Sequence, residues 1–224
     1  MNILCQKDAE QQRKNEVEYL EYTTNKVTLC GTLSGLPQPS HENHGRVFYT
    51  FQLEVERLSG ATDLLDVIAP ADVLEQMDLS GGQMIEVTGQ LRSFNNRQST
   101  GRRLVISVFA ESLQTCDGVP DNHVQLEGAI CKEPVYRRTP LGREICDVML
   151  AVNRQYRRAD YLPCIFWGKT AQITAGLPVG TRLSVTGRLQ SREYVKMLEN
   201  GSEKRTAFEV SAVSAEVLNP SSED

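Results

Sequence analysis

The second half of this 224-residue chain repeats the first half at a nearly constant spacing. Residue types that match 97 positions apart include the pairs Asn25/Asn122, Val27/Val124, Leu29/Leu126, Gly31/Gly128, Leu53/Leu150, Arg57/Arg154 and Asp63/Asp160. At a spacing of 98, VTGQLRS in the first half falls on VTGRLQS at 185–191. A repeat of this length predicts two copies of one folding unit.

Each copy is predicted to be built almost entirely from strands. In the first copy, alternating apolar and polar residues mark five strands, and a helix-like segment near 72–82 lies between the third and the fourth. Five short strands with a helix at that place fit the OB-fold, a partly open Greek-key barrel. We therefore expect an all-β protein of two tandem OB-fold barrels; a mixed ββα-type sheet is the structural competitor.

The repeat also sets the expected domain boundaries. We expect a helical arm at 1–24, a first barrel at 25–114, a linker at 115–121, a second barrel at 122–218 and a short acidic tail at 219–224. The arm is rich in Glu, Gln and Lys, with Val17 and Leu20 spaced as on one helical face.

Composition excludes several classes of function. No apolar run has the roughly 18 residues that span a membrane, and the N-terminus lacks the apolar stretch of a secretion signal. The six cysteines are scattered without a CxxC pair, so we expect a reducing cytoplasm, no disulfide and no zinc site. His41 and His44 lie in a loop-like stretch, where we expect solvated side chains instead of metal ligands. No phosphate loop and no nucleophile–base pair is evident, so we expect neither an enzyme nor a cofactor.

Charge is distributed unevenly between the copies. Residues 1–121 hold 10 Lys and Arg against 17 Asp and Glu, a net charge of −7, whereas residues 122–224 hold 14 against 12, a net charge of +2. The second copy is therefore the better place for a polyanion.

Residues 150–169 of the second copy carry the clearest functional signal. They read as two strands joined by a basic loop, Arg154 to Arg158. On the second strand, Leu162 and Phe166 share a face that a core explains, but Tyr161 and Trp167 lie on the opposite face. Exposed rings beside cations suit an unpaired nucleic-acid strand, because bases stack on the rings while the cations follow the phosphates. A second small core or a subunit contact would explain the same face.

The second copy resembles the bacterial single-stranded DNA-binding protein family over nearly all of 122–218. The resemblance is carried by NHVQLEGAICKEPVYRRTPLG at its start, then LAVNR, the pair Asp160–Tyr161, WGKTA, VTGRLQSREY and EVSAVSAEVL in the family's order. It implies stacking aromatics and phosphate-contacting cations at defined positions. The resulting candidate nucleic-acid-binding residues are Arg137, Arg154, Tyr156, Arg157, Tyr161, Trp167, Lys169, Arg188, Arg192, Tyr194 and Lys196.

The first copy keeps the barrel pattern but not these positions. Ser59, Leu64, Pro70 and Asn96 stand where the second copy has Tyr156, Tyr161, Trp167 and Tyr194. We expect the first copy to be mainly structural, an assembly partner or a docking site, with weak strand binding through its hairpin arginines as an alternative.

The resemblance implies a non-enzymatic protein that binds single-stranded DNA with little sequence preference, during replication, recombination or repair in the bacterial cytoplasm, near the nucleoid. RNA stays an alternative ligand, because stacking does not read the 2′-hydroxyl. The family usually assembles four barrels, so we expect a homodimer of this two-barrel chain, with a monomer as the alternative. The competing function is an OB-fold interaction or assembly module, such as a replication-restart accessory or a plasmid or phage factor.

Overall fold

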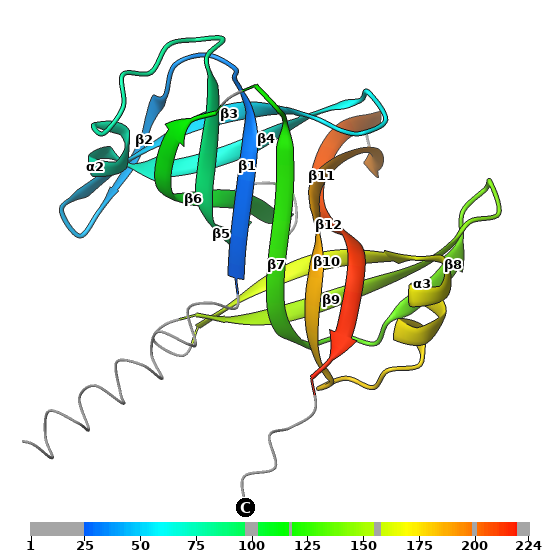
Figure 1. Ribbon diagram of the computed structural model, residues 1–224. Coiled ribbons are helices and arrows are strands. Elements are labelled where there is room, and N and C mark those ends of the chain that lie inside the picture. The colour runs from blue at the N-terminus through cyan, green and yellow to red at the C-terminus, as the bar shows by residue number, and fades with distance from the viewer. Residues whose placement is uncertain (1–24, 97–102, 117, 155–157, 199–200, 219–224) are drawn as a thin grey trace, which may run out of the picture.

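The computed structural model describes residues 25–96, 103–116, 118–154, 158–198 and 201–218 (Figure 1). The helical arm expected at 1–24 and the acidic tail expected at 219–224 lie outside the described residues. No helix in the described part of the chain has the length and apolarity that crossing a membrane requires.

The first copy forms a barrel in which a short helix separates its third long strand from its fourth. Its elements are β1 (Asn25–Leu33), β2 (Gln38–Asn43), β3 (Arg46–Glu56), β4 (Thr62–Pro70), α2 (Ala71–Leu74), β5 (Met84–Asn96) and β6 (Arg103–Thr115). The expected five strands and helix are present, and β2 is an additional short strand. It pairs only with β3 and is exposed at every residue, so it lacks the alternation that marks a half-buried strand.

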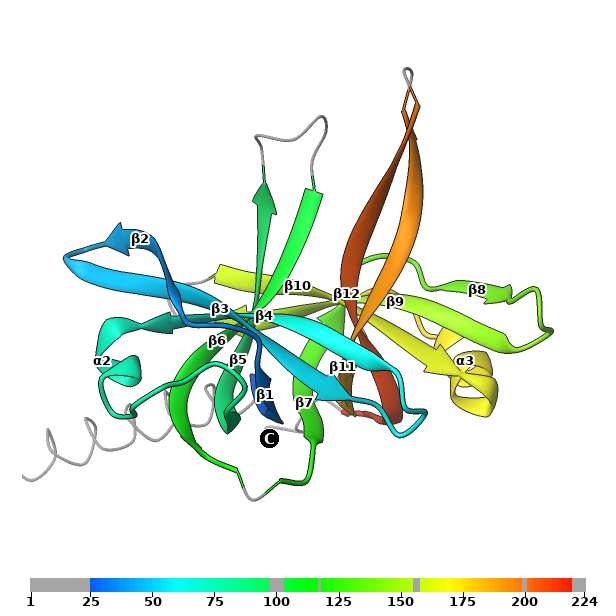
Figure 2. The same cartoon turned by 90° about the horizontal axis from the view of Figure 1, so that it is seen from above.

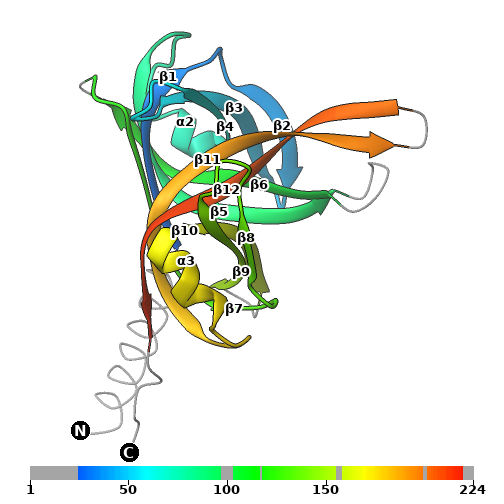
Figure 3. The same ribbon diagram turned by 90° about the vertical axis from the view of Figure 1, so that its right-hand side faces the viewer.

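The second copy repeats this order with a longer helix and a longer hairpin. Its elements are β7 (Asp121–Ile130), β8 (Val135–Arg138), β9 (Glu144–Arg154), β10 (Arg158–Trp167), α3 (Gly168–Ala175), β11 (Arg182–Leu198) and β12 (Gly201–Val217). The two long hairpins, β5–β6 and β11–β12, project to the same side of the molecule (Figure 2 and Figure 3).

Matched residues of the repeat fill the two cores. The side chains of Leu29, Leu53, Leu65 and Ile85 in the first barrel, and of Leu126, Leu150, Leu162 and Leu183 in the second, are all at most 1% exposed. Burying one such side chain contributes about 1.5–3 kcal/mol. The period-2 pattern was therefore retained in both copies because both barrels need these residues to fold.

The repeated Asn and Gly of the first strand have separate structural roles. Asn25 Nδ2 donates to the Leu91 carbonyl at 2.8 Å and Asn25 Oδ1 accepts from the Leu91 amide at 2.9 Å; Asn122 bonds Leu189 in the same way. These side chains act like one more peptide group in the ladder. At Gly31, a Cβ would lie 2.4 Å from the Glu54 carbonyl oxygen, so only glycine permits this approach of β1 to β3.

The two barrels are joined edge to edge through their first strands. β1 pairs antiparallel with β7 over six residues, and Val27 lies opposite its own repeat equivalent, Val124. A pseudo-twofold axis therefore passes between these two residues. The pairing makes the strands one twelve-stranded sheet, with β1 and β7 side by side at its centre (Figure 1).

Two buried carboxylates hold the barrels together on either side of this axis. Asp63 of the first barrel accepts hydrogen bonds from the backbone N–H and hydroxyl of Ser191 in the second barrel, both at 2.7 Å, and from Arg57 Nε at 2.7 Å. Asp160, its repeat equivalent, accepts from the Ser93 backbone N–H of the first barrel at 2.6 Å. Both carboxylates are fully buried, and each is satisfied by groups from both barrels.

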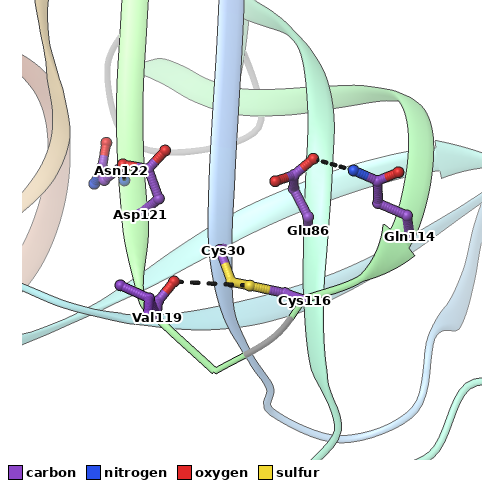
Figure 4. Close-up of a disulfide and its surroundings, with 7 residues drawn as sticks. All are labelled: Cys30, Glu86, Gln114, Cys116, Val119, Asp121 and Asn122. Carbon is purple, nitrogen blue, oxygen red and sulfur yellow. Dashed lines mark hydrogen bonds between the residues drawn. A yellow bond between two sulfur atoms is a disulfide. The ribbon is translucent and has the colours of Figure 1, made fainter.

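The expectation that the chain has no disulfide is wrong, because Cys30 and Cys116 are bonded (Figure 4). They are 86 residues apart in sequence, and meet because β1 and the end of β6 lie on either side of β5. Cys30 does have the buried strand position expected of it, at 1% exposure. Cys131, Cys146 and Cys164 are free.

Candidate nucleic-acid interface

Strand β10 presents two aromatic rings on the outside of the second barrel. Tyr161 is 47% exposed and Trp167 is 40% exposed, whereas Leu162, Cys164 and Phe166 between them are at most 1% exposed. The alternation predicted for this strand therefore places the two rings as expected. Ile165, which shares their parity, is 5% exposed and does not add to the exposed surface.

The strand register extends this surface over the neighbouring strands. Trp167 lies opposite Ile145 on β9, and Ile145 lies opposite Arg137 on β8. In the other direction, Ile165 lies opposite Ser211 on β12, and Ser211 lies opposite Arg188 on β11. Residues opposite one another share a face of a sheet. We call this surface the binding face; it contains Arg137, Tyr161, Trp167, Arg188, Arg192 and Tyr194.

The ring of Trp167 is fixed in place by a hydrogen bond and by the element that follows it. Its Nε1–H donates to Ser211 Oγ at 3.1 Å. Trp167 ends β10 and directly precedes α3, whose second residue, Lys169, is exposed. A tethered indole loses less freedom when a base stacks on it than a mobile one would.

Two cations of the binding face are already paired with carboxylates. Arg137 forms a bidentate pair with Asp147, at 2.6 and 3.2 Å, and this hydrogen bonding raises the pKa of Arg137. Arg192 pairs with Glu209 at 3.3 Å and lies 5.9 Å from the centre of the Tyr194 ring. Burial raises the pKa of Glu209, a shift that Arg192 opposes.

Arg188 and Lys169 have no ion-pair partner among the described residues, and both are exposed. Of the predicted cations, these two are therefore available to a phosphate without breaking an existing pair.

Arg154, another predicted cation, lies beside a buried carboxylate. Its Nη1 lies 3.4 Å from Oδ1 of the buried Asp160, and its side chain is 30% exposed. Arg57 pairs more closely with Asp63, through Nε at 2.7 Å, and also donates to the Ser191 carbonyl of the second barrel at 2.7 Å. Both matched arginines therefore lie at the interface between the barrels. Tyr156 and Arg157 lie outside the described residues, and Lys196 lies on β11 but its side chain is outside the described part.

Sequence reasoning missed the acidic residues of the binding face. Asp147 and Glu209 are spaced like many solvated carboxylates, and nothing in their immediate sequence distinguishes them. Only the register of β9 and β12 with their neighbours brings them beside Arg137 and Arg192. Strand parity on β12 was the one available signal, because Glu209 and Ser211 share a face.

The corresponding face of the first barrel has a different chemistry. Leu64 is 38% exposed at the position of Tyr161, Pro70 is buried at the position of Trp167, and Asp72, at the position of Lys169, pairs with Arg46 at 2.7 Å. Aromatic rings are present at other positions: His41 stacks on Phe48 with centroids 4.8 Å apart, and Phe109 lies 6.1 Å from Phe48. Among the described residues, only the second barrel therefore combines exposed rings on this strand with unpaired cations.

Residues that could ligate a metal are dispersed. In the described ranges, no group of three His, Cys, Asp or Glu residues lies close enough together to hold an ion. His41, one of the two weak candidates, lies on β2 against the Phe48 ring.

Comparison with known proteins places this fold and face in a family. The sequence model of the Single-strand binding protein family matches residues 121–218, which correspond to β7–β12. The single-stranded DNA-binding protein B of Bacillus subtilis is 40% identical over 80 residues, which are 33% of this chain and 71% of that relative. The chain belongs to the single-strand binding protein family.

Another member of the family, single-stranded DNA-binding protein 2 of Listeria innocua, is 37% identical over 107 residues, or 44% of this chain. The chain spans 65% of the length of that relative.

Solved structures of the family extend the likeness to both barrels. A deletion mutant of the single-stranded DNA binding protein from Thermus aquaticus has a TM-score of 0.70 and 25% sequence identity with this chain. The alignment covers 89% of this chain and 98% of the mutant chain. The wild-type protein of the same organism has a TM-score of 0.73 and 24% sequence identity, and the alignment covers 89% of this chain and 95% of the wild-type chain. The all-β architecture of OB-fold barrels is thus that of the family.

Proposed function

We propose that the second barrel binds single-stranded DNA through the binding face, without sequence preference. The observation that carries the proposal is the exposure of Tyr161 and Trp167, at 47% and 40%, on a strand that buries Leu162, Ile165 and Phe166. The relatives and the solved structures named above are single-stranded DNA-binding proteins, which supports the same ligand.

Bases would stack on the two rings while phosphates contact the cations beside them. Each stacked base contributes about 1–3 kcal/mol by alanine substitution, so two rings contribute about 2–6 kcal/mol. Arg188 and Lys169 can donate hydrogen bonds to phosphates directly. Arg137 and Arg192 would exchange their carboxylates for phosphates. Stacking tolerates any base because every base has a π face, so little sequence preference is expected.

Trp167 provides the test, because it is the single tryptophan of the chain. We expect oligo-dT to quench its fluorescence saturably at low salt, and the binding to weaken as salt rises. Tyr161→Ala should weaken binding about 5- to 150-fold, which corresponds to the loss of one stacked base. Leu64→Ala is the matched control, because Leu64 holds the same position in the first barrel and should leave affinity unchanged. Absence of quenching at low salt would refute the proposal.

We infer that such a protein coats exposed strands during replication, recombination or repair in a bacterial cytoplasm, and acts as a binding protein instead of an enzyme. RNA is the competing ligand, and competition between dT and U oligomers separates the two. We also propose that 25–114 and 122–218 are the two folding units, and that two chains associate to bring four barrels together. A sedimentation mass near the 25.0 kDa of one chain would refute the dimer.

A second function, that of a protein-interaction module, is favoured by the first barrel alone. Its face exposes Leu64 and Phe94, at 38% and 49%, and carries the His41–Phe48 stack. If Trp167 fluorescence does not respond to DNA, this function becomes the leading one.

A further inference from the structure

The first barrel forms a hydrogen bond with one residue of the binding face, Tyr161. The backbone N–H of Tyr161 donates to Ser93 Oγ of the first barrel at 2.7 Å. Ser93 lies on β5, which belongs to the long hairpin that projects beside the second barrel (Figure 2). A side chain 68 residues away in sequence therefore holds the backbone of a proposed stacking residue.

The residue next to Tyr161 is held by the same strand of the first barrel. Asp160 is fully buried and accepts hydrogen bonds from the Ser93 backbone N–H at 2.6 Å and from Arg92 Nη1 at 3.2 Å. Arg154 of the second barrel lies 3.4 Å from the same carboxylate. Two consecutive residues of β10 are thus fixed by two consecutive residues of β5.

The pseudo-twofold axis shows that the contact to Tyr161 is not a simple consequence of barrel packing. Ser191 is the repeat equivalent of Ser93, and its hydroxyl donates to Asp63 at 2.7 Å. Ser93 instead uses its hydroxyl oxygen to accept the N–H of the residue after Asp160. The two serines share a position in the repeat, and only the one facing the aromatic residue bonds the backbone of that residue.

We propose that Ser93 and Arg92 of the first barrel are positioning residues for Tyr161, so that the first barrel completes the binding site of the second. This inference rests on the proposed function. Fixing the β10 backbone at Asp160 and Tyr161 before DNA arrives lowers the ordering cost of stacking a base on the ring. The first barrel then contributes to affinity without touching DNA at this point.

Ser93→Ala tests the proposal with little collateral change. It removes the acceptor of the Tyr161 N–H, but the Ser93 backbone N–H can still bond Asp160. The loss of one such hydrogen bond, about 0.5–1.5 kcal/mol, should weaken oligo-dT binding about two- to tenfold in the Trp167 fluorescence assay. The dependence of affinity on salt should keep its slope, since no cation is removed. Ser93→Thr retains a hydroxyl and should restore most of the affinity.

A double-mutant cycle with Tyr161→Ala separates positioning from general structural damage. If Ser93 acts through Tyr161, then Ser93→Ala should cause no further loss of affinity once the ring has been removed. Ser112→Ala is the matched control, because the Ser112 hydroxyl bonds Thr88 within the first barrel, away from β10. This variant should bind as the wild type does.

The outcomes separate the positioning role from the proposed function. The positioning role would be overturned if Ser93→Ala left the affinity unchanged, if its loss of affinity persisted in full in the Tyr161→Ala background, or if Ser93→Thr did not restore the affinity. Binding by the wild type would still support the proposed function. No binding by the wild type would instead overturn the proposed function, and the inference with it.

Discussion

The buried carboxylate of Asp63 is expected to be among the most sensitive positions for the stability of the molecule. Asp63→Asn retains an oxygen that can accept from Ser191, but it removes the charge that faces Arg57. A broken buried ion pair costs about 3–5 kcal/mol. The Arg57 side chain is 29% exposed, so water can compensate part of its lost partner, and we expect a loss of about 2–3 kcal/mol in the free energy of unfolding.

Urea unfolding at pH 7 measures this loss, with the midpoint as the readout and the slope as a check that the transition is unchanged. Asp66→Asn is the control, because it makes the same substitution on β4 at a residue whose carboxylate accepts a hydrogen bond from the exposed Gln52 side chain. That variant should stay within about 0.5 kcal/mol of the wild type. A midpoint for Asp63→Asn equal to that of Asp66→Asn would refute the assignment of Asp63 as a charged link between the barrels.

The pH dependence of stability gives an independent check on the same group. Burial raises the pKa of Asp63, but hydrogen bonds from Arg57 and Ser191 outweigh this and hold the pKa below its usual value. A carboxyl whose pKa is lower in the folded state stabilises the protein above its unfolded pKa of about 3.9. That contribution is lost as pH falls through the folded pKa. The wild type should therefore lose stability below about pH 4 more steeply than Asp63→Asn does.

Two further predictions concern the disulfide and the binding face. Because Cys30 and Cys116 close a loop over a separation of 86 residues, reduction should lower the free energy of unfolding by about 4.5 kcal/mol, measured in urea with and without dithiothreitol. A Cys116→Ala variant should not respond to the reductant. Burial raises the pKa of Glu209, so protonation of Glu209 as pH falls should release Arg192 and raise the affinity for DNA. Glu209→Gln should bind oligo-dT about two- to fivefold tighter at pH 7, with a weaker pH dependence. Equal affinities would exclude competition between Glu209 and phosphate for Arg192.

The repeat made much of the fold predictable because its signals are local. Alternation at Leu29 and Leu126 marks strands whose burial depends on period 2 alone, and the structure buries both. Strand parity likewise placed Tyr161 and Trp167 on the exposed side of β10. Strand β2 has no buried face, so a method that senses burial cannot detect it.

Contacts between the copies could not be read from either copy alone. The repeat aligned Asp63 with Asp160 and Arg57 with Arg154, but their partners lie across the pseudo-twofold axis or beside it. The first copy has Arg57 where the second has Arg154, so both copies have an arginine at this position. In contrast, Lys169 and Arg188 of the second copy are matched by Asp72 and Gln90 of the first. Retention in both barrels was the signal that these arginines have a structural role. The pairing of Cys30 with Cys116 depends on tertiary structure in the same way.

Because β1 and β7 belong to one chain, their pairing does not depend on protein concentration. Had the two barrels been separate chains, their association would follow mass action and fall apart at low protein concentration. Here β6 ends at Thr115 and β7 begins at Asp121, so the second barrel is tethered to the first by only a few residues. The tether keeps each barrel at a high effective concentration next to the other. The paired state, together with the contact between Ser93 and Tyr161, should therefore persist however few copies of the protein a cell contains.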